Sequence, residues 1–250
     1  SYFVDEVNCG FGLGKVLKRP LIFDAPRSIP GYDREGIAGT LKGKGGVLSA
    51  DTVTRVLERA GFVFPPQAAA SSPDEVRKAC DTIGYPVAMK VIGLLHKSDV
   101  GGVRLRVGNA AGAVKVWHDL MSIPGASGVA VQKMVEGTEI ILGSSRAGDI
   151  GQLVMFGLGG IYTEVLKDVS FALAPLADEE CRRMIRSIRA YRILEGVRGQ
   201  KGVSIDVVSV NLARLSRLVS DFPAIREIDI NPLKGTGDHL YVVDARIIMD

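Results

Sequence analysis

Near the C-terminus, polar residues whose oxygen atoms could bind a cation alternate with apolar residues. Glu227, Asp229 and Asn231 are separated by single isoleucines, so in a β-strand their side chains would share one face while the isoleucines face the core. We expect the proline after Asn231 to end this strand. A second strand over 239–247 would return beside it and bring Asp244 to the same end. Three carboxylates and one amide oxygen would then converge against an apolar layer.

Ligation by oxygen alone suits a hard cation such as Mg²⁺, which in proteins usually also holds the phosphates of a substrate. Water solvates an isolated carboxylate well, so a cluster of carboxylates beside a buried strand favours a cation site. The alternative is an edge strand whose polar face is simply solvated. These residues alone leave both interpretations open.

Lys90 lies within an apolar run, 86–91 (PVAMKV), that predicts a buried strand. Burying an ammonium group without a partner is costly. We therefore expect Lys90 to form a structural ion pair with a carboxylate, to reach solvent with its amine, or to bind an anionic ligand.

A polar turn with two glycines, HKSDVGGV, follows that strand directly. Backbone N–H groups beside Gly101 and Gly102 could surround a phosphate, and Lys97 and Ser98 would add hydrogen-bond donors. His96, which begins the turn, is either a capping or surface residue or a nucleophile toward phosphorus, because neutral imidazole is competent in that role near pH 7.

Two strands predicted over 128–135 and 138–145 are joined by a connection whose backbone groups could pair with adenine. The residues concerned are Gln132, Lys133, Met134 and Val135. Glu136 or Glu139, just beyond them, could hold a ribose hydroxyl. The alternative is an ordinary hairpin.

A second glycine-rich segment, 156–161 (FGLGGI), could let the backbone approach a ligand closely. It lacks the lysine and hydroxyl residue that begin the helix of a P-loop. Glu164, Lys167 and Asp168 follow it and are either site residues or solvent-exposed polar positions.

The composition is that of an ordinary globular protein. Of the 250 residues, 46% are hydrophobic, and the net charge is only +3, which gives no strong case for nucleic-acid binding. We expect no membrane association, because the longest apolar run is too short to cross a bilayer. Three cysteines, far apart and odd in number, are typical of reduced thiols in the cytoplasm and offer no metal-binding spacing.

Predicted helices and strands are mixed along the chain without strict alternation, so we expect an α+β fold in two lobes. Helices are predicted from Ser49, from the capping box at Ser72, and over 109–121, 178–191 and 204–219, with a short strand over 62–64. We expect an N-terminal extension or linker over 1–47, a small lobe with its leading helix over 48–127, and a large lobe over 128–250.

Several of these segments occur together in a familiar order. They are GYPVAMK (84–90), HKSDVGGV (96–103), VEGTE (135–139), MFGLGG (155–160), EVLKD (164–168), APL (174–176), VRG (197–199) and EIDINPL (227–233). The ordered set resembles the ATP-grasp domain of NDP-forming acyl-CoA synthetases (acetate–CoA ligase, ADP-forming), close to their β subunit. The resemblance covers about residues 48–248 and implies a two-lobed ATP-grasp fold that binds ATP or ADP with Mg²⁺ between the lobes.

The resemblance also implies roles for single residues. Lys90 would bind phosphate, the connection at 132–135 would be the adenine hinge, and the loop containing His96 would cover the phosphates. His96 would relay phosphate from the phosphohistidine of a partner subunit, and we group Lys97 and Glu164 with it as candidate catalytic residues.

For the metal, the resemblance implies Asn231 and Asp244 as the Mg²⁺ ligands, which leaves Glu227 and Asp229 in a supporting role. One position departs from the family pattern, because Ala172 stands where family members often carry arginine. A contact to the γ-phosphate would then be lost, or supplied by Arg198, Lys97 or Arg104.

The implied reaction is acyl-CoA + ADP + phosphate ⇌ acid + CoA + ATP, run through phosphohistidine. The chain is too short to hold the family's CoA-binding and primary phosphohistidine domains as well, so it would be a β subunit that needs an α partner, or a segment of a fused chain. Other function classes are a stand-alone ATP-grasp carboxylate–amine ligase, a non-catalytic ATP-binding regulatory module, and a plain interaction domain. Mg²⁺-dependent nucleotide binding would separate the last class from the others.

Overall fold

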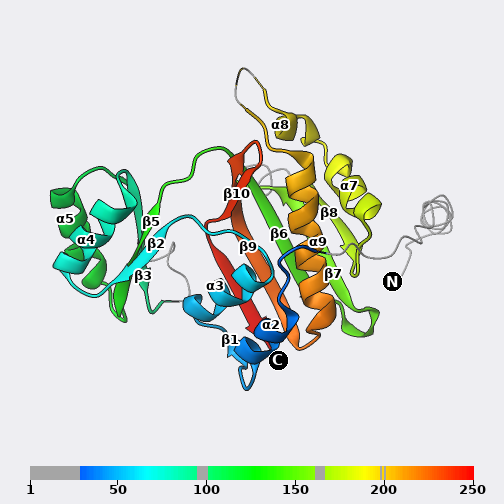
Figure 1. The fold of residues 1–250 in the computed structure, drawn as a ribbon, viewed down its shortest axis with the longest axis horizontal. Helices are drawn as coiled ribbons and strands as arrows, with labels where there is room; N and C mark the ends of the chain where they lie inside the picture. Colours follow the sequence, from blue (N-terminus) through cyan, green and yellow to red (C-terminus); the bar gives the residue numbers. More distant parts are fainter. Residues whose placement is uncertain (1–28, 95–100, 161–166, 198, 200) are drawn as a thin grey trace.

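The computed structural model describes residues 29–94, 101–160, 167–197, 199 and 201–250. Within them the chain forms two lobes, each built on an antiparallel sheet with its own helices and its own apolar core. The lobes lie side by side and are joined by two connections, drawn in cyan and green in Figure 1. The expected α+β class and two-lobed arrangement are confirmed.

The smaller lobe contains a sheet with the strand order β2-β5-β3-β4 and two helices that pack on one of its faces. Alternation along the strands places Val87, Met89 and Val131 in the core of this lobe, whereas Ala88 and Lys90 face the other way. The elements are β2 (Gln67–Ala70), α4 (Pro73–Ile83), β3 (Val87–Ile92), β4 (Val103–Val107), α5 (Ala110–Met121) and β5 (Gly128–Lys133).

Side-chain caps begin both helices of the smaller lobe where the sequence predicted them. The Ser72 hydroxyl accepts a hydrogen bond from Glu75 N at 3.3 Å, and the Asn109 side chain accepts one from Gly112 N at 2.8 Å. Each cap satisfies an N–H group that has no partner within its helix, which typically contributes about 1 kcal/mol.

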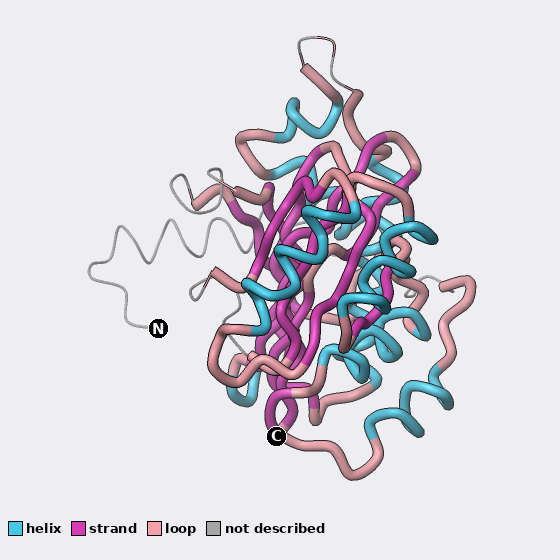
Figure 2. Tube along the Cα trace, turned by 90° about the vertical axis from the view of Figure 1, so that its left-hand side faces the viewer, coloured by secondary structure: helices cyan, strands magenta, loops and turns pink. Residues whose placement is uncertain are grey.

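The larger lobe contains a sheet with the order β1-β11-β9-β6-β7-β8, and β10 pairs with β9. Helices α7 and α9 pack on one face of this sheet, and the layering of helices beside strands is visible in Figure 2. The elements are α2 (Arg34–Leu41), β1 (Gly46–Val47), α3 (Ala50–Arg59), β6 (Thr138–Arg146), the 3₁₀ turn η1 (Gly148–Ile150), β7 (Gln152–Leu158), β8 (Val169–Leu173), α7 (Asp178–Ser187), α8 (Tyr191–Glu195), α9 (Ile205–Asp221), β9 (Ile225–Thr236), β10 (His239–Val242) and β11 (Ala245–Met249).

The lobe boundaries differ from those expected at residues 48 and 128. Helices α2 and α3 pack into the core of the larger lobe through Ile37, Val56 and Leu57, and β1 pairs with β11 at the edge of the large sheet. Strand β5 belongs to the small sheet. The smaller lobe therefore spans about residues 67–133, because the apolar stripe of α3 is buried against β11 rather than against the small sheet.

The strand expected over 62–64 is wrong. Those residues are an extended connection between the lobes, in which Phe62 is buried in the core of the larger lobe and Val63 O accepts a hydrogen bond from Val242 N at 2.8 Å. The helix expected over 178–191 is interrupted, since α7 ends at Ser187 and α8 begins at Tyr191. None of the described helices is both long and apolar enough to cross a membrane.

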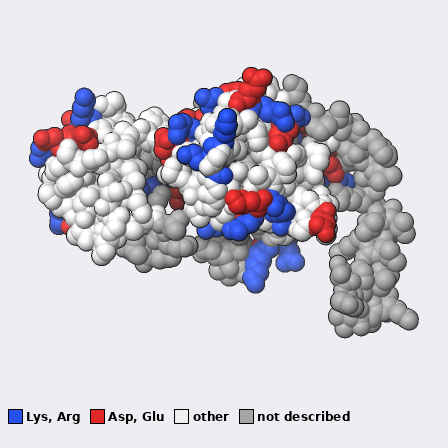
Figure 3. Space-filling view, turned by 90° about the horizontal axis from the view of Figure 1, so that it is seen from below, with Lys and Arg blue, Asp and Glu red and all other residues white. Residues whose placement is uncertain are grey.

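Charged side chains of both signs are interspersed over the face of the larger lobe shown in Figure 3. Several form exposed ion pairs, such as Arg55 with Asp51 in α3 at 2.7 Å. Pairs of this kind contribute little to stability because water and salt screen them.

Candidate functional site

Lys90, on β3, is almost completely buried, with 8% of the residue exposed. Its ammonium group lies where the two lobes meet. Nζ donates to Gln132 Oε1 in the same lobe at 2.9 Å and to the backbone carbonyl of Val243 in the larger lobe at 2.6 Å. The sequence led us to expect a carboxylate partner, contact with solvent or an anionic ligand for this ammonium, whereas these two acceptors are a side-chain amide and a backbone carbonyl.

The larger lobe meets Lys90 through the short segment between β10 and β11. The single strand expected over 239–247 is therefore wrong, because Val243 and Asp244 interrupt it. Val243 N donates to Pro232 O at 2.9 Å, and Asn231 N donates to Asp244 O at 3.0 Å. These bonds bring the two predicted metal ligands, Asn231 and Asp244, into adjacent positions, and both residues are exposed.

The alternation predicted around Asn231 is confirmed. Ile228 and Ile230 are buried in the core, while Glu227 and Asp229 are half-buried on the opposite face of β9. The proline after Asn231 does not end the strand, as β9 continues to Thr236 and pairs there with β10.

The carboxylates of Glu227, Asp229 and Asp244 lie close enough for their charges to interact, but they do not form the expected metal-binding group. Glu227 Oε1 accepts a hydrogen bond from the Arg246 guanidinium at 2.6 Å, so that its charge is already paired. Burial raises the pKa of the Asp229 carboxyl; Arg246 lowers this pKa, and the charges of Glu227 and Asp244 raise it. In the part of the chain that the structure describes, no group of three or more His, Cys, Asp or Glu side chains is arranged to hold a metal ion.

A site at Asn231 and Asp244 would thus offer Mg²⁺ one carboxylate and one amide oxygen. That donor set fits a nucleotide-bound Mg²⁺, which usually keeps several waters and takes one or two carboxylates together with substrate phosphates. It does not fit a metal cage made only of protein ligands.

The predicted adenine hinge is the connection between the lobes that follows β5. Among the described residues, no backbone–backbone hydrogen bond outside the strands engages residues 134–136. Gly137 then approaches β9 so closely that a Cβ atom there would lie 2.1 Å from Gly235 O, at a backbone φ of +122°. Met134 and Val135 are half-buried and Glu136 is exposed.

Two residues assigned to nucleotide binding have side chains that are already engaged. Gln132 bonds Lys90, and Lys133 Nζ donates to Gly84 O at 2.9 Å within the smaller lobe. The backbone N–H of Lys133 is also engaged, since it donates to Pro66 O at 2.8 Å.

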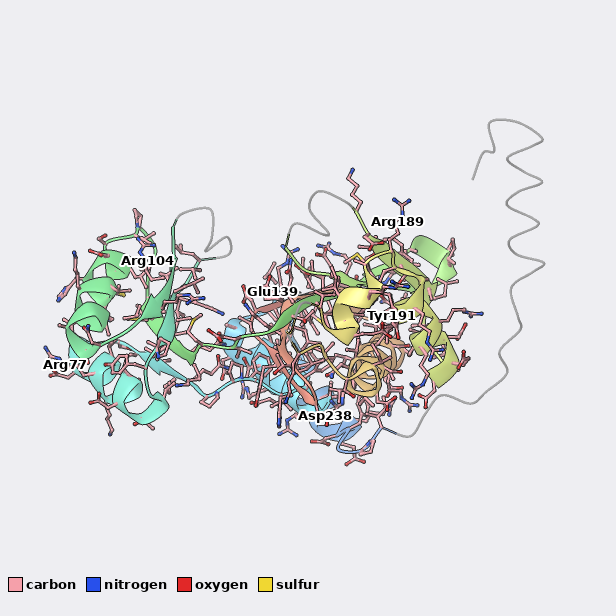
Figure 4. All side chains as sticks on the ribbon, turned by 90° about the horizontal axis from the view of Figure 1, so that it is seen from above. Arg77, Arg104, Glu139, Arg189, Tyr191 and Asp238 are labelled. Carbon is pink, nitrogen blue, oxygen red and sulfur yellow. The ribbon has the colours of Figure 1, made fainter. Side chains whose placement is uncertain are left out.

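Glu139 lies at the start of β6, at the large-lobe end of the hinge (Figure 4). Its carboxylate accepts from Lys234 Nζ at 2.8 Å, directly across the β6–β9 pairing. The glycine-rich segment after β7 lies against it, since a Cβ on Gly159 would lie 2.8 Å from Glu139 Cβ. Glu139 would therefore accept a hydrogen bond from a ribose hydroxyl while remaining in its ion pair with Lys234.

Asp168 is not a site residue. It is 8% exposed, and its two carboxylate oxygens accept from Arg189 N at 2.8 Å and Ala190 N at 2.7 Å. These bonds hold the chain at the start of α8, so Asp168 acts as a structural cap.

Ala172 stands at the position where members of the resembled family often carry arginine. It is buried in the core of the larger lobe, opposite Val154 of β7. Arg104, a possible substitute, is on the exposed strand β4 and donates to the Gly101 carbonyl.

The remaining predicted residues concern the loop after β3. Gly101 has a φ of +65°, and Gly102 O accepts from Val91 N at 2.8 Å. Five residues named from the sequence, His96, Lys97, Ser98, Glu164 and Arg198, lie outside the described residues.

Sequence reasoning missed four groups that meet the predicted residues. Gln67 bonds Gln132 at 3.1 Å, the Val243 carbonyl accepts from Lys90, and Lys234 and Arg246 pair with predicted carboxylates. The register of β9 against β6 and β11 would have revealed the last two. A backbone carbonyl and an isolated glutamine carry no comparable sequence signal.

Comparison with known proteins places this geometry in a family. The family model for the ATP-grasp domain matches residues 39–249. The chain is 42% identical over 224 residues to acetate–CoA ligase (ADP-forming) I of Archaeoglobus fulgidus, covering 86% of this chain and 33% of that protein. It is 40% identical over 204 residues to the β subunit of acetate–CoA ligase (ADP-forming) I of Pyrococcus furiosus, covering 78% of this chain and 88% of that subunit. The chain thus spans a third of the first relative and most of the second.

A solved structure of acetyl-coenzyme A synthetase 1 from Candidatus Korarchaeum cryptofilum, in complex with coenzyme A and Ca-AMPCP, matches with a TM-score of 0.79 at 31% identity, over 87% of this chain and 100% of that chain. Another structure of that protein, with coenzyme A and Mg-AMPPCP, has its phosphohistidine segment pointing towards the nucleotide-binding site; it matches with a TM-score of 0.72 at 29% identity, again over 87% of this chain and 100% of that chain. The ATP-grasp fold is therefore confirmed, and the chain belongs to the ATP-grasp domains of the ADP-forming acid–CoA ligase family.

Proposed function

We propose that this chain is the nucleotide-binding β subunit, or the corresponding segment of a fused chain, of an ADP-forming acid–CoA ligase. The observation that carries the proposal is the meeting of Lys90 from one lobe with the Val243–Asp244 segment of the other. In this proposal the Lys90 ammonium would bind phosphate there and Asn231 and Asp244 would bind Mg²⁺, and these are the two kinds of group that phosphoryl transfer requires.

In this proposal each half of the site has a defined task. Lys90 Nζ donates to the phosphates, the backbone groups of 134–136 pair with adenine, and Glu139 accepts from the ribose. Asn231 and Asp244 hold the Mg²⁺, which when bound neutralises charge on the phosphates. Positioning and charge neutralisation of this kind account for most of the catalysis in phosphoryl transfer.

The phosphoryl group would pass through His96. A neutral imidazole nitrogen attacks the γ-phosphorus of ATP, a nitrogen–phosphorus bond forms, the bond to the β-phosphate oxygen breaks, and ADP leaves. The reverse direction makes ATP from ADP and the phosphohistidine. Lys97 and Glu164 are the further candidates for contact with the transferred group.

The acyl and CoA chemistry would lie on other domains. Of the two relatives compared above, one is a protein of which this segment matches a third and the other is a separate β subunit, which supports a CoA-binding α subunit or fused domains as the partner of this chain. A small-molecule acid and its acyl-CoA would be the substrates. The free, buried thiols of Cys80 and Cys181 are consistent with a reducing cytoplasm.

The test is phosphoryl transfer to the chain itself. Incubation with γ-³²P-labelled ATP and Mg²⁺ should label the protein with a phosphate that is stable to base and labile to acid, as a phosphoramidate is. The label should be absent from a His96→Ala variant, and it should be removed by added ADP as labelled ATP forms.

A matched control is His118→Ala, because His118 lies on the exposed side of α5 in the same lobe. That variant should be labelled like the wild type. Tight binding of Mg·ATP without any label would instead favour a non-catalytic ATP-binding module, and label of unchanged amount in His96→Ala would exclude the relay.

A further inference from the structure

Gln132 is a buried amide whose polar atoms are all used within the protein. The residue is 3% exposed, and its Oε1 accepts from Lys90 Nζ at 2.9 Å. Its Nε2 donates to Gln67 Oε1 at 3.1 Å and to Val243 O at 3.4 Å. An amide that is enclosed and satisfied in this way has no group left for a base.

The pairing of the strands explains why these side chains meet. Gln132 of β5 lies directly opposite Gln67 of β2 and Ala88 of β3, and Lys90 lies two residues along β3 from Ala88. Side chains separated by two residues in a strand share a face, and diagonal neighbours are within reach of long side chains. Ala88 leaves the space through which Gln132 and Lys90 approach each other.

The direction of the hydrogen bonds is fixed by chemistry. An ammonium group can only donate, so Gln132 must turn its oxygen toward Lys90 and its NH₂ toward Gln67 and Val243. The Val243 carbonyl therefore accepts from both Lys90 and Gln132. Lys90 is held at one point in space by an acceptor from each lobe.

The acceptor from the larger lobe is itself fixed to the predicted metal ligands. Val243 N donates to Pro232 O, next to Asn231, and the carbonyl of Asp244 accepts from Asn231 N. The Lys90 acceptor, the carbonyl of Val243, thus belongs to the residue immediately before Asp244.

We propose that Gln132 is a positioning residue that fixes the Lys90 ammonium against the Val243 carbonyl and so couples phosphate binding in the smaller lobe to metal binding in the larger lobe. This assignment replaces the adenine contact expected for Gln132, and it rests on the proposed function in that Lys90 binds nucleotide phosphate.

A double-variant cycle separates positioning from direct contact. Gln132→Met retains the volume and the buried character of the side chain but cannot hold the ammonium. It should weaken Mg·ATP binding about fivefold to tenfold, the factor expected from one hydrogen bond. In a Lys90→Met background the same change should add less than about twofold, because a positioning residue acts through its partner.

Two further readouts distinguish this role from a general structural one. ITP differs from ATP only at the 6-position of the base, so Gln132→Met should weaken both nucleotides equally and leave their affinity ratio unchanged. It should also reduce the gain in nucleotide affinity that Mg²⁺ provides. The matched control is Gln152→Met, which removes an equally buried amide from two hydrogen bonds on β7, far along the large sheet, and should leave both quantities unchanged.

The nucleotide-free protein provides an independent arm. Loss of both bonds to Val243 in the Lys90→Met/Gln132→Met variant should separate the lobes and raise the radius of gyration in small-angle X-ray scattering, with thermal unfolding confirming a folded chain. If the wild type binds no nucleotide, the proposed function fails, and this arm still decides the coupling between the lobes. An unchanged radius of gyration or a changed ratio of ATP to ITP affinity would overturn the inference. So would independent losses of affinity, in which the double variant loses the product of the two single losses.

Discussion

Replacing Lys90 with methionine should weaken nucleotide binding strongly while changing the stability of the fold only slightly. The ammonium is buried and donates two hydrogen bonds, of 2.9 Å to Gln132 and 2.6 Å to Val243. Methionine fills nearly the same volume without charge and adapts readily to a buried site.

The magnitudes follow from these contacts. A hydrogen bond involving a charged group contributes about 1.5–3 kcal/mol, so losing one between Lys90 and a phosphate should weaken ATP binding about 10- to 150-fold. Burying an ammonium costs several kcal/mol, and its hydrogen bonds offset that cost. We therefore expect the free energy of unfolding to change by less than about 2 kcal/mol in either direction.

Isothermal titration of Mg·ATP measures the first quantity and urea unfolding measures the second. Lys115→Met is the matched control, because Lys115 is an exposed lysine on α5 of the same lobe, and its affinity for ATP should stay within twofold of the wild type. ATP affinity of a folded Lys90→Met variant within about threefold of the wild type would refute the assignment of Lys90 to phosphate.

Two further perturbations test the hinge and the core. Gly137→Ala, whose Cβ would lie 2.1 Å from Gly235 O, should lower the free energy of unfolding by more than about 2 kcal/mol in urea titrations. The control is Gly148→Ala, also at positive φ but in open space, which should lower it by only about 1 kcal/mol. Equal losses in the two variants would contradict the close approach of Gly137 to β9. Burial raises the pKa of Cys181 to about 12, so the folded state keeps its proton as the unfolded thiol ionises above about pH 8.5. Stability should be full below that pH and decline above it by up to about 1.4 kcal/mol per pH unit in urea titrations at pH 8–10. A Cys181→Ala variant should lack this component of the slope, and parallel slopes would contradict the burial of the thiol.

Local pattern predicted the parts of the fold that local chemistry decides. The Ser72 hydroxyl caps its helix as the capping box predicted, and the helix expected from residue 109 begins at a cap formed by the Asn109 amide, since a cap satisfies N–H groups within three residues. Alternation placed Ile228 and Ile230 in the core and left Asn231 exposed for the same reason, because the period of a strand is two residues.

The assignment of segments to lobes depended on long-range packing. The stripe of Val53, Val56 and Leu57 indicates that α3 is buried, but its partner is β11, nearly two hundred positions later in the chain. Likewise, the proline at 232 did not end β9, because its carbonyl accepts from Val243 and pairing with β10 continues beyond it.

The sequence singled out candidate site residues but not the network that joins them. Lys90, Asn231 and Asp244 were proposed from their types, their surroundings and the family resemblance, whereas their connection runs through a backbone carbonyl. The sequence predicted that Gln132 lies in a strand beside the hinge. Its hydrogen bonds, however, are made with two side chains from other strands, Gln67 and Lys90. Contacts of this kind follow from register and lobe orientation, which a single sequence does not specify.

The most direct test of the account is the Mg²⁺ dependence of ADP binding, measured by isothermal titration with the wild type and with Asn231→Ala and Asp244→Ala variants. We expect Mg²⁺ to raise the affinity of the wild type at least tenfold, and that gain to be lost in both variants while binding without Mg²⁺ is retained, since Lys90 is intact. An equal gain from Mg²⁺ in the wild type and in both variants would contradict the placement of the metal between Asn231 and Asp244, and with it the proposed site.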